Sequence, residues 1–90
     1  MKKARIAVAW LLKEDWPRWQ AIDSELPPYD RWLEKINQGV ARAEAAGATA
    51  EKVTVDPDVF SEWCTSQGKA IDRNTRSEYA ARQLMKRTAH

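Results

Sequence analysis

Apolar side chains follow two different patterns along this chain, and the patterns predict its elements. Residues 5–12 are apolar at nearly every position, which is typical of a strand covered on both faces. Residues 51–55 alternate between polar and β-branched side chains, which predicts a second strand with Val53 and Val55 facing inward. The sequence therefore contains two short strands far apart in the chain.

Helices are predicted between and after these strands. In residues 29–46 apolar side chains recur at every third or fourth position, and Gly47 follows as a helix end. Pro17 and Pro57 each follow a possible capping aspartate, which predicts a short helix to about residue 22 and another over residues 57–67.

A last helix is expected to begin at Thr75, because Thr75-Arg76-Ser77-Glu78 matches a capping box. Its inward side chains are expected to be Tyr79, Ala80, Leu84 and Met85. The tail after about residue 86 is expected to fray.

The order β-α-α-β-α-α predicts a single small α/β domain over residues 1–90. Two strands joined by a long helical connection can lie parallel, with helices covering the sheet. A two-stranded sheet keeps two free edges and is a poor independent unit. We therefore expect that a second copy of the chain extends the sheet in a homodimer, or that a further strand covers an edge.

Tryptophan is unusually frequent: the chain has five, against one Phe and two Tyr. Trp32 and Trp63 fall on apolar helix faces and are predicted core residues, with Trp10 packed against them. Trp16 and Trp19 lie beside a proline and a predicted loop, so the sequence allows them to be core or an exposed contact. Together with Arg18, these two tryptophans are the candidate protein interface.

The charge and the cysteine content limit the expected partners and the expected cellular compartment. A net charge of +2 does not by itself indicate a nucleic-acid partner, although basic residues gather near both ends. No segment has the apolar length of a membrane span or the pattern of a signal peptide, so no membrane partner is expected. A single cysteine fits a reducing compartment, and we expect a cytoplasmic protein.

Few residues could carry catalysis. The only histidine, His90, is the last residue, and Cys64 has no cation one helical turn away to activate it. The carboxylates of Asp56, Asp58 and Glu62 gather at a helix start, where the helix dipole favours acidic side chains in any case. We therefore expect no catalytic residue, metal or cofactor, and a small carboxylate-based hydrolase or metal-binding protein is only the third hypothesis.

Residues 51–87 run strand, helix, turn, helix, and in this outline the chain resembles ribbon-helix-helix repressors. In that family an antiparallel ribbon from two copies enters the major groove. The resemblance implies that Lys52 and Thr54 read bases and that Arg73 and Arg76 meet phosphate. Antiparallel pairing of residues 51–55 across a dimer axis would favour this DNA-binding hypothesis, and parallel pairing with residues 5–10 would favour the α/β domain.

A second resemblance covers nearly the whole chain. Residues 29–33 read Tyr-Asp-Arg-Trp-Leu, and residues 55–64 read Val-Asp-Pro-Asp-Val-Phe-Ser-Glu-Trp-Cys. These motifs resemble a group of short bacterial proteins of unknown function, which implies a bacterial, cytoplasmic, single-domain protein and no particular activity. The sequence thus favours a non-enzymatic accessory or regulatory protein that acts through protein–protein contacts, with a ribbon-helix-helix-like DNA-binding regulator as the alternative.

Overall fold

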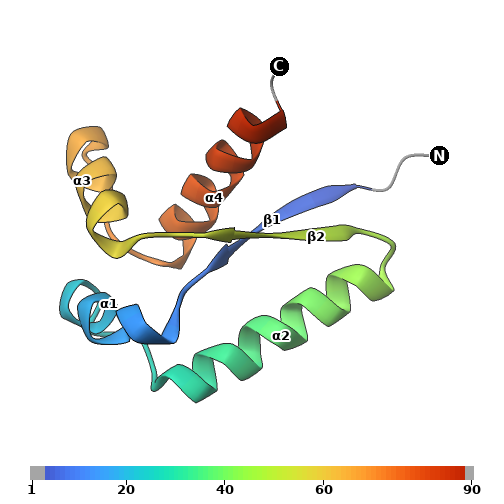
Figure 1. Ribbon diagram of the computed structural model, residues 1–90, viewed down its shortest axis with the longest axis horizontal. Coiled ribbons are helices and arrows are strands. Elements are labelled where there is room, and N and C mark those ends of the chain that lie inside the picture. Colours follow the sequence, from blue (N-terminus) through green and yellow to red (C-terminus); the bar gives the residue numbers. More distant parts are fainter. Residues whose placement is uncertain (1–3, 89–90) are drawn as a thin grey trace.

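The computed structural model describes residues 4–88, and its elements follow the predicted order (Figure 1). The sheet consists of β1 (Arg5–Trp10) and β2 (Thr49–Thr54). The helices are α1 (Trp16–Ile22), α2 (Tyr29–Ala45), α3 (Pro57–Gln67) and α4 (Arg73–Thr88), and the short 3-10 helix η1 (Lys13–Asp15) precedes α1. The predicted small α/β domain is confirmed.

The two strands pair in parallel within one chain, as predicted. At one end of the ladder the Thr49 amide donates to the Ala4 carbonyl at 2.7 Å, and at the other the Val55 amide donates to the Trp10 carbonyl at 3.0 Å. β1 ends earlier than the apolar run predicts, because α3 begins at Pro57 and leaves the residues after Trp10 without a partner strand.

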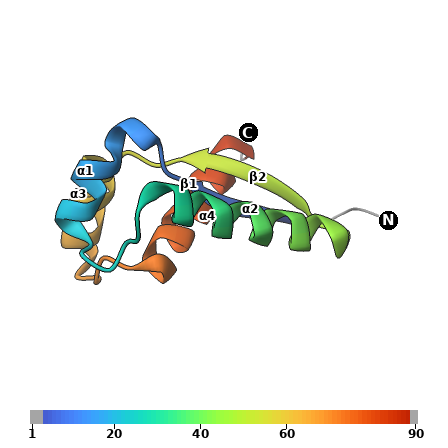
Figure 2. The same ribbon diagram turned by 90° about the horizontal axis from the view of Figure 1, so that it is seen from below.

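Helices cover the two faces of this sheet, with α2 on one side and α4 on the other (Figures 1 and 2). On the α2 side, the Trp10 and Trp32 rings meet edge to face, with centroids 5.6 Å apart. Val53 and Val55 are buried, as their alternation predicted. Val55 belongs to the same core cluster as Tyr79 of α4. Each face of the sheet thus buries side chains against one long helix.

An aromatic core fills the space where α1, α2 and α3 meet. The ring centroid of Trp16 lies 5.5 Å from that of Trp32, and that of Trp19 lies 5.5 Å from that of Phe60. Trp32 is buried, as the apolar stripe of α2 predicted. Large rings at these separations bury much area and attract one another, which suits a small core. The core cluster also contains Leu11, Leu26, Val55, Cys64 and Tyr79.

Both ends of α3 match their sequence signals. The Asp56 side chain accepts hydrogen bonds from the amides of Asp58 and Val59, at 2.9 and 3.1 Å. Gly68 ends the helix with φ 64°, a left-handed conformation in which glycine avoids the steric cost of a Cβ. The capping aspartate and the terminal glycine therefore fix the length of α3.

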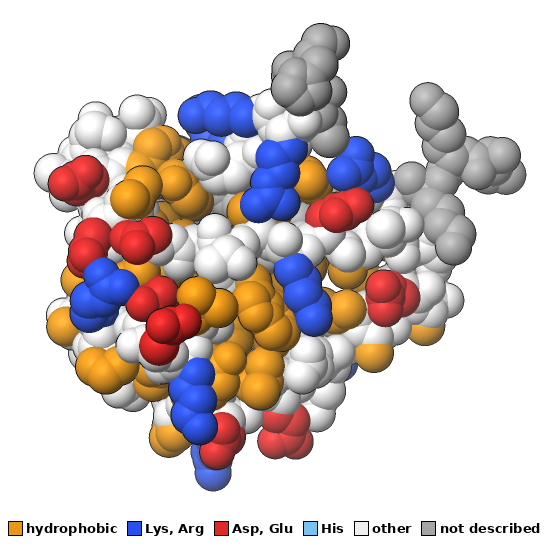
Figure 3. Space-filling view, viewed as in Figure 1, with side chains coloured by type: hydrophobic (Ala, Val, Ile, Leu, Met, Phe, Trp, Pro, Cys, Tyr) orange, Lys and Arg blue, Asp and Glu red, His pale blue; other side chains and the backbone are white. Residues whose placement is uncertain are grey.

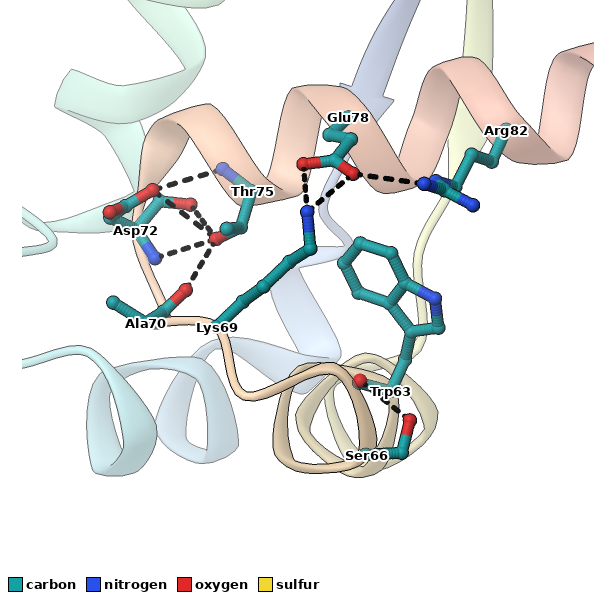
Figure 4. A network of polar contacts seen from close by, with 8 residues as sticks. All are labelled: Trp63, Ser66, Lys69, Ala70, Asp72, Thr75, Glu78 and Arg82. Atoms are coloured by element: carbon teal, nitrogen blue, oxygen red, sulfur yellow. Dashed lines mark hydrogen bonds and ion pairs between the residues drawn. The ribbon is translucent and has the colours of Figure 1, made fainter.

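The start of α4 differs from the prediction. The helix begins at Arg73, and its cap is Asp72, whose carboxylate accepts from the Thr75 amide at 2.9 Å while the Thr75 hydroxyl accepts from the Asp72 amide at 3.0 Å (Figure 4). The bond from the Thr75 amide is the main reason that the pKa of Asp72 is lowered. The predicted capping box starting at Thr75 is wrong. Thr75 is the third residue of the helix, and it bonds reciprocally with the capping residue Asp72.

Glu78 serves instead to tie α4 to the end of α3 (Figure 4). Its carboxylate accepts two hydrogen bonds from the Lys69 ammonium, at 2.8 and 2.7 Å, and pairs with Arg82 at 3.3 Å. The bond from Lys69 is the main reason that the pKa of Glu78 is lowered. Both cations lie 5.6 Å from the centre of the Trp63 ring, which is half-buried beside the core and thus less enclosed than predicted.

The C-terminal part of α4 corrects one further expectation. Met85 is 69% exposed, so it does not face the core. The helix continues through Thr88, and residues 89–90, which belong to the tail expected to fray, lie outside the described part of the chain.

Candidate binding cleft

A cleft of about 620 Å³ opens between α2 and the first turns of α4. Its floor is Ala7, Val8 and Ala9 of β1, and the loop that joins α1 to α2 contributes residues 23–27 (excluding Ser24) to one end. Figure 2 shows this loop and the start of α4 below α2. The α2 wall is formed by Trp32, Lys35, Ile36, Gln38, Gly39 and Arg42, and the α4 side by Asp72, Arg73, Arg76 and Ser77. The volume lies within the range of ordinary ligand pockets.

The floor of the cleft is the free edge of β1. Ala4 and Trp10 use their carbonyls to bond β2, and successive residues of a strand turn their backbone groups to alternate sides. The even-numbered residues of β1 therefore bond β2, and the N–H and C=O groups of Ala7 and Ala9 point toward the cleft. Unpaired backbone groups at a sheet edge can bond an additional strand.

The dimensions of the cleft fit an extended segment. From Trp32 to Arg42 the α2 wall spans ten residues, or about 15 Å along the helix. At about 3.3 Å per residue, a strand of four or five residues covers this length.

Gly39 lies in the α2 wall without a structural reason to be glycine. Its φ is not in the left-handed region, and a Cβ added there would meet no atom within 4 Å among the described residues. A glycine inside a helix costs about 1 kcal/mol relative to alanine. The contacts of Gly39 within residues 4–88 do not explain this cost.

A buried ion pair holds the end of the cleft together. The Arg76 guanidinium donates to the Asp23 carboxylate at 2.7 Å, and the two side chains are only 8% and 10% exposed. Asp23 belongs to the loop between α1 and α2, and Arg76 belongs to α4. The pair thus fixes the loop against α4 at the point where both line the cleft.

The tryptophans of the candidate interface lie in the core. Trp16 is 6% exposed and Trp19 is fully buried, so the structure resolves the two alternatives that the sequence left open. Trp16 Nε1 donates to the Pro27 carbonyl at 3.1 Å. Arg18 between them is exposed and pairs with Asp15 and Asp58. An exposed contact made by the two indoles is therefore not available in this conformation.

The four residues of the DNA-binding hypothesis lie in different surroundings. Arg73 and Arg76 line the cleft, and Arg76 is buried in its pair with Asp23. Thr54 lies in a second hollow, and the Lys52 ammonium lies 4.2 Å from the centre of the Trp10 ring. The strand that carries Lys52 and Thr54 pairs in parallel with β1, which is the arrangement expected for the α/β domain rather than for an antiparallel ribbon.

The basic residues do not form a single patch on the face that carries β2. Figure 3 shows acidic and basic side chains interspersed over this face, with apolar side chains exposed between them. Within residues 4–88, none of the helices is long and apolar enough to cross a membrane.

The carboxylates and the thiol considered for catalysis take part in contacts that stabilise the fold. Asp56 caps α3, and Asp58 pairs with Arg18. The Cys64 thiol is buried, and burial is the main reason that its pKa is raised. In the described part of the chain, no three His, Cys, Asp or Glu side chains are grouped to hold a metal ion.

Apart from Arg73 and Arg76, which the DNA-binding hypothesis named, sequence reasoning missed the cleft residues, although two of them carry a signal. Gly39 interrupts an otherwise helix-forming segment, and Arg42 follows it by three residues on the same side of the helix. Ala7 and Ala9 carry no signal, because alanine is common in buried strands. Comparisons with protein-family models, curated proteins and solved structures give no match.

Proposed function

We propose that this chain is a non-enzymatic accessory or regulatory protein that binds an extended segment of another protein. The segment lies in the cleft between α2 and α4 and adds a strand to the free edge of β1. The observation that carries the proposal is that the backbone groups of Ala7 and Ala9 have no partner within residues 4–88 and lie on the floor of a cleft long enough for a short strand.

Two further features support this mode of binding. β1 already pairs with β2 along its other edge, so the added strand would meet a preformed and twisted template. Gly39 leaves space beside this edge at the expense of helix stability. Backbone bonds supply affinity in this mode, and side chains that meet the two helices supply selectivity.

Selection of displayed random heptapeptides on the full chain tests the proposal. Selected peptides should bind the native chain and lose at least about tenfold in affinity for Gly39→Trp, because the new ring occupies the cleft. Ala41→Trp is the matched control: Ala41 is exposed, lies about 200° around α2 from Gly39, and does not line the cleft.

A second readout locates the bound segment. Amide hydrogen exchange at Ala7 and Ala9 should slow when a selected peptide binds, because these amides gain acceptors. The proposal is refuted if no peptide is enriched, if the selected peptides bind native and Gly39→Trp chains equally, or if exchange at Ala7 and Ala9 is unchanged by binding.

A further inference from the structure

The proposed function does not say which side chains the partner segment carries. The charged residues that line the cleft indicate which kind of segment fits. Its acidic residues are Asp23, Glu25 and Asp72, and its basic residues are Lys35, Arg42, Arg73 and Arg76. Asp23 and Arg76 neutralise each other. Asp72 accepts a hydrogen bond from the Thr75 amide and keeps its negative charge, so the other three cations of the cleft outnumber the carboxylates of Glu25 and Asp72 by one. Within residues 4–88, none of the ion pairs includes Lys35, Arg42 or Arg73.

From this arrangement we infer that the segment bound in the cleft is acidic. The inference rests on the proposed function and adds the side-chain chemistry of the partner. Lys35, Arg42 and Arg73 are exposed cations that line one cleft without an anionic partner in the described chain. Complementary charge around a binding edge speeds association with a partner of opposite charge and disfavours partners of like charge.

The spacing of the cations fits a strand. Lys35 and Arg42 are seven residues apart on α2, or about 10 Å along one side of the helix. Side chains on one face of an added strand repeat every two residues, or about 6.7 Å, so two flexible cations at this spacing can reach carboxylates at positions i and i+2. Arg73 belongs to α4 on the other side and can meet the residue between them.

Acidic segments also suit this kind of capture. A segment rich in glutamate and aspartate stays disordered on its own, because it has little apolar surface to bury and carries a high net charge, so its backbone is free to bond a template. The cations Lys35, Arg42 and Arg73 attract the carboxylates of such a segment and offset part of the repulsion between them. The chain thus recognises an extended acidic segment of a partner protein rather than a folded apolar surface.

The test compares three labelled peptides with the same host: acetyl-Thr-(Glu-Thr)₃-amide and its Gln and Lys counterparts. Fluorescence polarisation with the full chain should give about tenfold tighter binding for the Glu peptide than for the Gln peptide, and weaker binding for the Lys peptide. The preference should shrink as salt is raised, because these charges are exposed.

Two charge reversals on α2 form a matched pair. Arg42→Glu should abolish the preference for the Glu peptide, whereas Arg31→Glu should retain it. Arg31 is exposed on the same helix, lies outside the cleft, and makes no ion pair with the described residues. Equal loss in both variants would mean that only net charge matters, and the inference would fail.

The outcomes separate this inference from the proposed function. If the Gln peptide binds as tightly as the Glu peptide and both are lost in Gly39→Trp, the acidic inference fails and the proposed function stands. If no peptide from the host series or from the selection binds, both fail. If single-stranded oligodeoxythymidine displaces the Glu peptide and binds more tightly, the cleft is a nucleic-acid site and the assignment to an acidic peptide is overturned.

Discussion

The Asp23–Arg76 ion pair offers the sharpest test of how the cleft is held together. Arg76→Met removes the cation and leaves the Asp23 carboxylate almost fully shielded from water. Its other hydrogen bond, from the Glu25 amide at 3.2 Å, comes from the same loop and does not replace the bond to α4. A buried charge without its partner is strongly unfavourable.

The expected loss is large for a chain of this size. Removing one partner of a buried pair costs about 3–5 kcal/mol of unfolding free energy. A protein of 90 residues has a total of about 5–13 kcal/mol, and its melting temperature should fall by about 15–30 °C. The double variant Asp23→Leu/Arg76→Met removes both charges and should recover most of the loss, because apolar side chains of similar volume suit a buried position.

Urea unfolding followed by tryptophan fluorescence measures these differences. Arg5→Met is the matched control, because the Arg5–Glu51 pair at 3.2 Å is 47% and 36% exposed and should contribute less than about 1 kcal/mol. The reasoning is refuted if Arg76→Met is no more costly than Arg5→Met, or if the double variant is no more stable than the single one. If Arg76→Met does not fold, Arg76→Lys keeps the charge and should still show a measurable loss.

Two further predictions concern the core. Trp16→Phe should cost about 1 kcal/mol more unfolding free energy than Trp19→Phe, because Trp16 Nε1 donates to the Pro27 carbonyl whereas Trp19 Nε1 is buried without a partner among residues 4–88. Equal losses in urea unfolding would contradict this account. Native Cys64 should react with iodoacetamide at least about tenfold more slowly than in the unfolded chain, and its rate should rise at a higher pH, because burial raises the thiol pKa. Mass spectrometry follows the alkylation, and similar rates in both states would show that the thiol is accessible.

Local chemistry allowed much of the fold to be predicted. Alternation in residues 51–55 indicated a strand that buries Val53 and Val55, and the Asp56 cap and Gly68 fixed the ends of α3. Such signals act over a few residues, so they can be recognised without the rest of the chain. A local signal gave a wrong prediction at the start of α4. There Asp72 and Thr75 form the reciprocal capping pair instead of Thr75 and Glu78.

The surroundings of Trp16 and Trp19 needed the tertiary structure. A short helix with a proline and two indoles can pack inward or stand exposed, and only its position against α2 and α3 decides between them. Trp16 meets Trp32, and Trp19 meets Phe60, which is 41 residues further along the chain. Contacts at such separations leave no pattern in a window of ten or fifteen residues.

The two strands, the helices between and after them, and a parallel pairing across a long helical connection could all be predicted from local sequence patterns. The candidate site was decided only by tertiary structure. The edge of β1 faces a cleft because α2 and α4 lie on opposite sides of a sheet that has two strands in the described part of the chain (Figure 1). The backbone groups of Ala7 and Ala9 and the charge of Arg42 thus come together from distant segments, and side-chain periodicity describes one segment at a time.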